Sequence, residues 1–314
     1  MAMIADHWSE LVEPRLRRAF YIGFGQEDRR QSVIPEVFNV QGSSLVDEKL
    51  FPIGGLASSG WNFEDSGRVQ YDEAVKGYEE TLTHHEFAKG VIIERKLIDD
   101  NRISRAIAMV EALGDSAFRM REKAGANVFI NAFSSATSET LDDYGTDATG
   151  ADLVALCSTA HPRNPLDSTT DSNEGTTALS ASGLSTTRQL MMDFVDMRGD
   201  LINAMPDLLL VPNELEDTAR IAVGSAQDPD SANNAINPQN GRYRVVVWNY
   251  LTDANSWFLI DSGKMRNSLL WYDRIPLEFG REQDFDTFQA KFRAYSRFSL
   301  GWSDWRFIYG QNPS

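Results

Sequence analysis

Cysteine is almost absent from this chain, and long apolar runs are absent altogether. The single cysteine among the 314 residues, Cys157, excludes an intramolecular disulfide framework. No apolar run approaches the length of a membrane span, and residues 1–20 hold acids and arginines where a signal peptide needs an apolar stretch. We therefore expect a protein that is made in the cytosol and has no membrane partner.

Basic residues are also in short supply. The 30 lysines and arginines stand against 46 aspartates and glutamates, which gives a formal net charge of −16 and a pI near 4.7. Such a chain repels nucleic acid phosphates, so an electrostatic grip on DNA or RNA is not expected as its main activity. The length allows two domains or one large one with a substantial core.

Common catalytic and cofactor motifs are missing. The sequence has no phosphate loop of the Gly-x-x-x-x-Gly-Lys type, no Gly-x-Ser-x-Gly elbow and no dinucleotide fingerprint. Gly263 and Lys264 stand without the preceding glycine of a phosphate loop. Carboxylates are plentiful, but no pair is singled out by its spacing. We predict no catalytic residue, no cofactor and no metal site. We therefore expect that the protein is not an enzyme.

Three groups of metal-ligating residue types are better explained without a metal. His84, His85 and Glu86 are adjacent, and neighbours on a strand point to opposite faces. Cys157 and His161 have a ligand-like spacing but no third group to orient or complete a site. The acidic run Asp142, Asp143, Asp147 and Asp152 and the later group Asp167, Asp171, Asn173 and Gly175 invite a calcium interpretation. Ser182 stands where a calcium loop needs its bidentate glutamate, so we expect a solvated loop.

The strongest positive feature is residues 103–133, which predict one helix of roughly 46 Å, far longer than the average globular helix. An apolar stripe runs along it through Ile103, Ala106, Ile107, Val110, Leu113, Ala117, Phe118, Ala124 and Val128. The opposite face holds Ser104, Arg105, Glu111, Asp115, Arg119, Glu122 and Lys123. Asp99, Asp100 and Asn101 supply a cap signal at its start.

Two glycines interrupt the apolar stripe, and each costs about 1 kcal/mol against alanine in a helix interior. Gly114 and Gly125 lie nearly three turns apart, so they share a face. We expect the backbone of another element to approach the helix closely there. Beyond Asn127 the stripe breaks down at Phe129, Ile130 and Phe133, which predicts an end buried on several faces.

The segments before the long helix look like an arm and a hairpin. Residues 1–60 hold a short helix through Trp8, Leu11, Val12, Leu16 and Phe20, followed by many glycines and prolines. Residues 67–97 read as a long strand pair with polar faces, and such a hairpin needs a partner surface because it is marginal alone.

The segments after the long helix alternate between polar loops and short elements. Residues 134–183 are polar with little periodicity, and Ser185–Ala204 predicts a second amphipathic helix. Leu208–Val211 reads as a buried strand, and Pro212 opens a helix through Leu215, Ala219 and Ile221. Tyr243–Tyr250 and Trp257–Ile260 read as a strand pair. The last 44 residues hold 12 of the 33 aromatics, which predicts a buried sheet under the long helix.

Three stretches, in this order, resemble the major capsid proteins of tailed bacteriophages, particularly the Mu-like major head subunits. The first runs from Gly77 to Gly90 and on into Glu94–Asp100. The second joins Leu208–Pro212 with Gly241–Val247 and Tyr250–Leu259. The third is Tyr295–Phe298 with Asp304–Arg306. The resemblance covers residue 66 to the C-terminus and depends on the order of the stretches, because none has the fixed spacing of a catalytic motif.

The resemblance implies an α+β fold of the tailed-phage capsid type. Its parts would be an N-terminal arm (1–60), an extended loop (61–97), a peripheral domain with the spine helix (98–183), an axial domain (184–266) and a return to the peripheral sheet (267–314). Some relatives begin with a scaffolding region, and this chain has no room for one before its arm. Relatives that cross-link use a lysine in the extended loop. Lys76 and Lys89 lie there, but we cannot place the matching asparagine and glutamate, so no cross-link is predicted.

The implied function is self-assembly into pentamers and hexamers that close into an icosahedral virion shell around double-stranded DNA. The shell forms in the bacterial cytoplasm, and the implied partners are portal, scaffolding and decoration proteins. A cellular encapsulin-like shell uses the same fold and is the first alternative. An enzyme of unknown type is the alternative from a different class. Many modest interfaces per subunit would stabilise a shell through multivalency.

Overall fold

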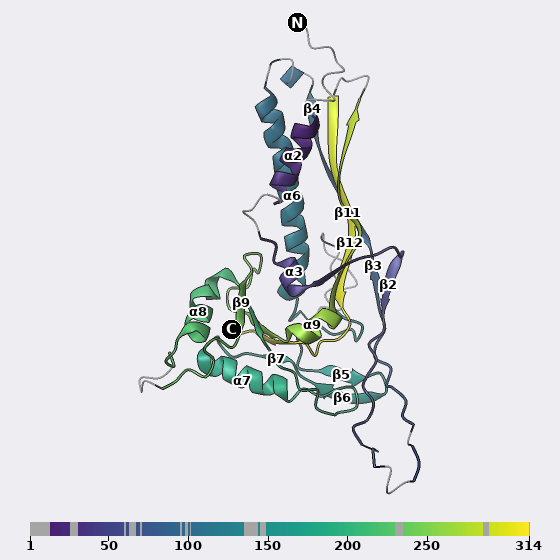
Figure 1. Ribbon diagram of the computed structural model, residues 1–314, viewed down its shortest axis with the longest axis vertical. Coiled ribbons are helices and arrows are strands. Elements are labelled where there is room, and N and C mark those ends of the chain that lie inside the picture. Colours follow the sequence, from purple (N-terminus) through teal and green to yellow (C-terminus); the bar gives the residue numbers. More distant parts are fainter. Residues whose placement is uncertain are drawn as a thin grey trace.

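The computed structural model shows an elongated molecule with a tall upper part, a wider lower part and a loop that projects beyond the lower part (Figure 1). It describes residues 13–25, 31–59, 61–62, 67–69, 71–94, 96–97, 100, 102–134, 144, 149–229, 235–284 and 289–313. Helices and strands are mixed, and the long helix runs the height of the upper part. The predicted α+β class is confirmed.

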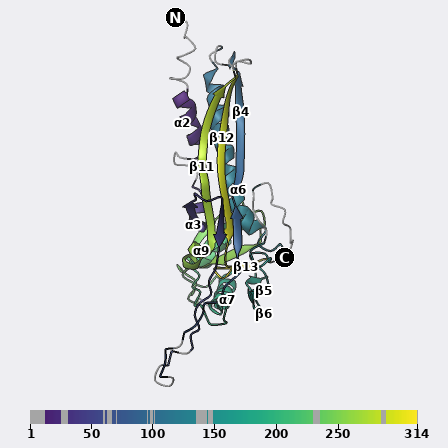
Figure 2. The ribbon, with the colours of Figure 1, turned by 90° about the vertical axis from the view of Figure 1, so that its right-hand side faces the viewer.

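The upper part is a four-stranded sheet packed against two helices (Figure 2). The strand order is β1 (Asn39–Gly42), β11 (Leu269–Gln283), β12 (Gln289–Trp302) and β4 (His85–Glu94). Among the described strands of this sheet, β1 and β11 are parallel neighbours and the other pairs are antiparallel. Helix α6 (Ile103–Ile130) lies along β12 and β4, and α2 (Glu13–Gly23) lies along α6. The predicted aromatic sheet beneath the long helix is confirmed.

The arm helix α2 drapes over its own subunit. Leu16 and Phe20 are buried in a core shared with Val110 of α6 and Phe292 of β12. Phe20 also stacks on Phe279 of β11, with ring centroids 4.8 Å apart. Trp8, Leu11 and Val12, which the sequence adds to this helix, lie outside the described residues. The short helix α3 (Ile34–Val37) follows before β1.

The two faces of α6 follow the predicted pattern with one exception. Every residue of the predicted apolar stripe is buried or half-buried. On the opposite face, Glu122 is buried, because Ser32 and Trp248 supply hydrogen bonds to its carboxylate. The placement of Glu122 on a solvated face is therefore wrong.

Both ends of α6 differ from the sequence prediction. Arg102 occupies the N-cap position without a side-chain cap, whereas Asp100 bonds through its backbone to Lys96 in the preceding turn. Asp99 and Asn101 lie outside the described residues. The helix ends at Ile130, and residues 131–133 form a turn in which the Ala132 amide bonds to the Phe129 carbonyl at 3.2 Å. The last helical turns are buried on several sides, as predicted.

The two helix glycines have different neighbours. A Cβ on Gly114 would lie 2.1 Å from the carbonyl oxygen of Phe20, and one on Gly23 would lie 2.1 Å from that of Glu111. The α2 and α6 backbones are therefore in direct contact, which confirms the prediction for Gly114. A Cβ on Gly125 would instead meet the Trp248 ring at 3.0 Å, so its close neighbour is a side chain and not a backbone.

The lower part contains a second sheet, with the order β7 (Glu174–Gly175), β13 (Ile308–Gln311), β10 (Trp257–Ile260), β8 (Leu208–Val211) and β9 (Arg244–Val247). The fully buried strand β8 confirms the sequence prediction. The predicted pairing of β9 with β10 is wrong, because β8 lies between them. Strands β8 and β10 each have four consecutive buried residues, which fits an interior position in the sheet. Strand β9 is partly exposed, which fits an edge.

The helices of the lower part are shorter than predicted. Helix α7 (Ala181–Met192) starts four residues before the predicted Ser185, with the Ser180 side chain capping Gly183, and ends well before Ala204. Asp193 is the C-cap residue, and beyond it Val195 forms an isolated bridge with Leu201, with Gly199 at φ 92° in the turn between them. The 3₁₀ turn η1 (Asn213–Leu215) leads into α8 (Glu216–Gly224), which buries Ala219 but exposes Ile221. Helix α9 (Ser262–Ser268) follows β10.

Two loop predictions are also corrected. In place of a solvated loop, β5 (His161–Asn164) and β6 (Asp167–Asp171) form an antiparallel hairpin. The strand pair predicted within residues 67–97 is not formed, because β3 (Glu80–Thr83) pairs with β2 (Asp47–Leu50), whereas β4 joins β12. The chain therefore changes sheets at His84.

A shared core joins the two parts. The C-terminal turns of α6 contribute Ala124, Val128 and Phe129 to a buried cluster that includes strands of both sheets. Phe129 lies edge to face with Trp248 and with Phe258 of the lower sheet, at centroid distances of 5.9 and 5.4 Å. On the upper sheet, Phe38 makes edge-to-face contacts with both Phe129 and Trp271. The end of α6 is thus the place where the two sheets meet.

Candidate functional site

The loop between β2 and β3, residues 51–79, projects away from both sheets and carries apolar side chains in the open; we call it the projecting loop (Figures 1 and 2). Its exposed apolar residues are Phe51, Ile53, Leu56, Trp61, Val69 and Tyr71. Trp61 is 82% exposed and Tyr71 is 95% exposed. Exposed aromatic side chains gathered on one segment mark a contact surface.

Backbone contacts and one side chain hold the base of this loop together. The Gly54 amide donates to the Val75 carbonyl at 2.7 Å, and the Gly77 amide donates to the Pro52 carbonyl at 2.9 Å. Met197 from the lower part packs against both glycines, since added Cβ atoms there would lie 3.1 and 2.6 Å from its side-chain atoms. Any side chain at Gly54 or Gly77 would push Met197 away.

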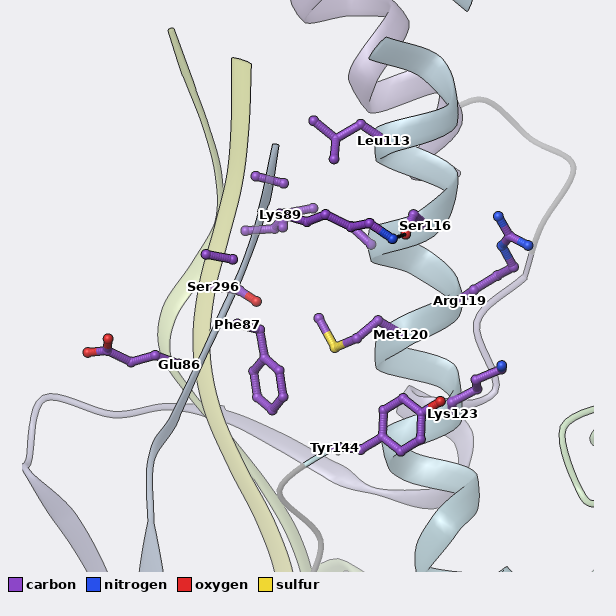
Figure 3. Close-up of a pocket in the computed structure, with 14 residues that line it drawn as sticks. Glu86, Phe87, Lys89, Leu113, Ser116, Arg119, Met120, Lys123, Tyr144 and Ser296 are labelled. Carbon is purple, nitrogen blue, oxygen red and sulfur yellow. Dashed lines mark hydrogen bonds between the residues drawn. The ribbon is translucent and has the colours of Figure 1, made fainter. Parts of the chain in front are cut away.

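A groove of about 540 Å³ lies between β4 and α6 on the upper part (Figure 3). Alternate residues Phe87 and Lys89 of β4 point towards it, as the period of a strand requires. From α6 it is lined by Leu113, Ser116, Arg119, Met120 and Lys123, whose spacing of three and four residues places them on one helix face.

The groove combines an apolar floor with a basic rim. Phe87, Leu113 and Met120 provide apolar surface, and Lys89, Arg119 and Lys123 provide positive charge, whereas the Glu86 side chain points away from α6 (Figure 3). The Lys89 ammonium donates to the Ser116 hydroxyl at 3.2 Å, and Arg119 pairs with Asp115 at 2.8 Å. This arrangement suits an apolar segment that also carries negative charge.

The buried carboxyl of Glu122 connects three segments of the chain. It accepts hydrogen bonds from the Ser32 hydroxyl and from the Trp248 indole N–H, the latter at 2.8 Å. Burial raises the pKa of Glu122, although these hydrogen bonds oppose the shift. The group ties α6 to the segment before α3 and to the end of β9, so its role is structural.

The residues His84, His85 and Glu86, considered and set aside as metal ligands, are divided by the change of sheets. His84 is buried, and its Nδ1 lies 2.9 Å from the Ser299 hydroxyl of β12, whereas Nε2 has no hydrogen-bond partner among the described residues. His85 and Glu86 lie on β4, where His85 pairs with Phe298 and Glu86 with Arg297. Burial lowers the pKa of His84.

Cys157 and His161 have different surroundings. The His161 ring stacks on Trp305, and its Nδ1 lies 2.8 Å from the Asp152 carboxylate. Cys157 is fully buried, and burial raises the pKa of its thiol well above the usual range. A thiol that resists ionisation is a poor nucleophile. This geometry fits the incidental thiol expected from the sequence.

The acidic residues considered for calcium serve in turns and ion pairs. Asp171 forms a bidentate pair with Arg163 at 2.7 and 3.0 Å, and Asp167 accepts from the Thr169 amide at 2.9 Å. Asn173 accepts from the Ser158 amide at 2.8 Å, and Gly175 lies in β7. Asp142, Asp143 and Asp147 lie outside the described residues.

Other candidate sites are likewise occupied by structural contacts. Asp261 caps α9 by accepting from the Gly263 and Lys264 amides at 3.0 and 3.1 Å, so this pair begins a helix and not a phosphate loop. Within the described part of the chain, no three His, Cys, Asp or Glu side chains gather as metal ligands would. The same residues include no helix both long and apolar enough to cross a membrane.

Comparison with known proteins decides between the remaining interpretations. A sequence model described as phage capsid protein matches residues 78–310, from just before β3 to β13. The chain belongs to the phage capsid protein family. The match covers the long helix of the capsid protein and both sheets apart from β1 and the last residue of β13, and it favours a phage shell subunit over an encapsulin-like cellular shell. A comparison of the sequence with curated proteins finds no match.

Solved structures show the same fold at low sequence identity. The mature capsid of bacteriophage PhiM1 is 11% identical, with a TM-score of 0.57 over 91% of this chain and 88% of that one. The virus-like particle from Pyrococcus furiosus is 9% identical, with a TM-score of 0.55 over 95% and 98%. The capsid of a native GTA particle is 14% identical, with a TM-score of 0.54 over 91% of each chain.

The family match makes this chain a major capsid protein of the phage type, with a structural role in the virion shell, and the solved structures share its fold. The Mu-like subtype stays a prediction. Sequence reasoning missed two parts of the capsid protein's surface: the basic groove, whose lining comes from four elements, and Arg198 at the base of the projecting loop. The spacing Asp196-Met197-Arg198-Gly199-Asp200 is a turn signal that could have drawn attention to the second.

Proposed function

We propose that copies of this chain assemble into pentamers and hexamers that close around packaged double-stranded DNA. The capsid fold and the family match support this function. The observation that carries it is the exposed apolar surface of the projecting loop, because Trp61 and Tyr71 gain most of their burial energy only against another copy. No catalytic activity is part of the proposal.

The division of the chain follows the same proposal. Residues 1–60 form the N-terminal arm, 61–97 the extended loop, 98–183 the peripheral domain, 184–266 the axial domain and 267–314 the return to the peripheral sheet. The strand pairing supports one adjustment, namely that the loop begins at residue 51 after β2 and ends before β3.

The basic groove between β4 and α6 is the surface that receives the projecting loop of a neighbouring subunit. Residues 61–75 of the loop include Trp61, Tyr71, four acids and one arginine, which gives a net charge of −3. The groove offers apolar surface and three cations. The charges on the two surfaces are therefore complementary.

Additional partners follow from the same role. A portal, a scaffolding protein and decoration proteins bind the shell, and assembly takes place in the bacterial cytoplasm. A covalent cross-link is not included. Lys76 of the projecting loop pairs with Glu79, and Lys89 of β4 bonds to Ser116, so both lysines have noncovalent partners.

Negative-stain electron microscopy of the expressed full chain tests the proposal. The wild type is expected to form closed hollow particles, or rings of five and six subunits. A Trp61→Ser, Tyr71→Ser double variant should lower the yield of particles at least about tenfold, because a buried aromatic at an interface contributes about 2 kcal/mol or more. Its melting temperature as an unassembled subunit should match the wild type, since both side chains are exposed.

Leu166→Ser is the matched control. Leu166 is 93% exposed at the turn between β5 and β6, far from the projecting loop along the chain. Its replacement should leave particle yield within about twofold. A wild-type chain that stays monomeric at high concentration, with or without co-expressed phage head proteins, contradicts the proposal.

A further inference from the structure

A five-residue turn of the lower part faces the base of the projecting loop. It follows α7 and is closed by the Asp196 amide, which donates to the Asp200 carbonyl at 2.7 Å. The Asp196 carboxylate also accepts from the amides of Arg198 and Asp200, at 2.7 and 3.0 Å. Gly199 takes the left-handed conformation that the turn requires. The hydrogen bonds within the turn therefore fix the backbone of Arg198 independently of the contacts that its side chain makes with the loop.

The guanidinium of Arg198 bridges the two limbs of the projecting loop. Nε donates to the Gly55 carbonyl at 3.1 Å on the outgoing limb. On the returning limb, Nη2 lies 3.0 Å from the Asp72 carboxylate and donates to the Glu73 carbonyl. One planar fork thus holds three acceptors that lie on both sides of the loop, which is a geometry that a lysine ammonium does not reproduce.

Two carboxylates complete the contact. Asp72 accepts from the Ala57 amide at 2.7 Å, and this hydrogen bond together with Arg198 lowers the pKa of Asp72. Asp200 accepts from the Ser58 amide at 3.0 Å, which lowers the pKa of Asp200. The outgoing limb is therefore bound at three consecutive contacts, Gly55, Ala57 and Ser58, just before the exposed tip.

We infer that Arg198 is a positioning residue, which sets the direction of the projecting loop relative to the lower part and thereby the angle between neighbouring subunits in the shell. The inference rests on the proposed function, because the angle matters only when the loop binds another copy. The contact is polar and partly exposed, with 23% of the Arg198 side chain and 37% of the Asp72 side chain accessible. Its loss should redirect the loop without unfolding either sheet.

Arg198→Gln tests this inference, with Arg220→Gln as the matched control. Arg220 also pairs with a carboxylate, Glu216, but on the exposed side of α8. In the unassembled Arg198→Gln subunit, hydrogen exchange of the Ala57 and Ser58 amides should become about tenfold faster, the effect of losing a hydrogen-bonded contact, and the melting temperature should stay the same. In assembly, the diameters of the particles should broaden to at least twice the wild-type spread.

Asp72→Ala removes the loop side of the same contact. It should likewise speed hydrogen exchange of the loop amides and broaden the spread of particle diameters. The double variant should be no worse than either single variant, because the two residues act as one unit. If Arg198→Gln lowers the melting temperature of the subunit, the test passes to Asp72→Ala. A broadened spread of particle diameters in that variant supports the role of the contact, and an unchanged spread overturns it.

The failure of this inference is distinguishable from the failure of the proposed function. Wild-type particles together with Arg198→Gln and Asp72→Ala particles of unchanged, uniform diameter overturn the role of Arg198 and leave the shell function intact. A wild-type chain that forms no particles overturns the shell function. In that case, if the Ala57 and Ser58 amides exchange at the same rate in the variants as in the wild type, the claim that Arg198 holds the loop is overturned as well.

Discussion

At the scale of single residues, small and polar side chains decide where backbone segments can approach. Gly114 and Gly23 allow α2 to touch α6, since either Cβ would lie within 2.1 Å of a carbonyl oxygen of the other helix. Arg121 makes a bidentate pair with Asp273 of β11 at 2.9 and 3.0 Å and lies over the Trp271 ring. These contacts fix the helices on the sheet more specifically than the apolar stripe alone does.

Gly114→Ala should destabilise the subunit by about 2 to 3 kcal/mol, because overpacking against a backbone outweighs the better helix propensity of alanine. Gly125→Ala should destabilise the subunit less than Gly114→Ala, since its Cβ would meet the Trp248 ring at 3.0 Å and not a backbone atom at 2.1 Å, and alanine gains about 1 kcal/mol of helix propensity. Gly224→Ala, with no atom near its Cβ position, is the control. Urea unfolding followed by circular dichroism measures all three, and equal effects at Gly114 and Gly224 would contradict the packing argument.

At the scale of elements, the joint between β3 and β4 decides how the projecting loop leaves the body. His84 sits at this joint, and burial holds its pKa below the ordinary value of 6.5. The charges that face it are Glu48 and Asp47 from β2, Arg274 from β11 and Arg297 from β12. The acids favour protonation of His84 and the arginines oppose it, so burial determines the direction in which its pKa shifts.

The stability of the subunit should therefore fall on mild acidification. A lowered pKa in the folded state means that the unfolded chain binds the proton first, so the contribution of His84 is complete above pH 6.5 and is lost as the pH falls through the folded pKa. His84→Gln should flatten this part of the pH profile of the melting temperature, measured by scanning fluorimetry between about pH 7.5 and pH 5. His85→Gln is the control. An identical slope in wild type and His84→Gln would refute the assignment.

At the scale of the whole molecule, like charge opposes assembly and apolar contacts drive it. Each copy has a formal charge of −16, which repels its neighbours over about 10 Å at 0.1 M salt. The ion pairs proposed between a projecting loop and a basic groove would contribute only about 0 to 1 kcal/mol each, so they would not offset this repulsion alone. Burial of Trp61 and Tyr71 has to supply the remainder.

Assembly should accordingly improve with added salt. Raising NaCl from about 20 mM to about 300 mM shortens the screening length roughly fourfold and should increase the fraction of subunits in particles, measured by light scattering and sedimentation. A fraction that falls steadily across this range would mean that ion pairs, and not apolar burial, dominate the interfaces. The Trp61→Ser, Tyr71→Ser variant should stay unassembled at every salt concentration.

The sequence by itself determined the features that depend on local periodicity. The 3.6-residue apolar repeat predicted α6 to within three residues at its C-terminal end, the run Leu208–Val211 predicted β8, and the aromatic density predicted the sheet beneath the helix. The resemblance of ordered stretches, and not any chemical motif, predicted the family. The mixed α+β fold followed from the same order.

Only the tertiary structure decided which strands are neighbours and where polar groups are buried. The pairing of β3 with β2, and the insertion of β8 between β9 and β10, join segments that no local pattern relates. Glu122 follows the helical period of the solvated face, yet Ser32 and Trp248 bury it. The groove and the Arg198 contact likewise depend on residues far apart in sequence, since their chemistry exists only once the chain brings them within hydrogen-bond distance.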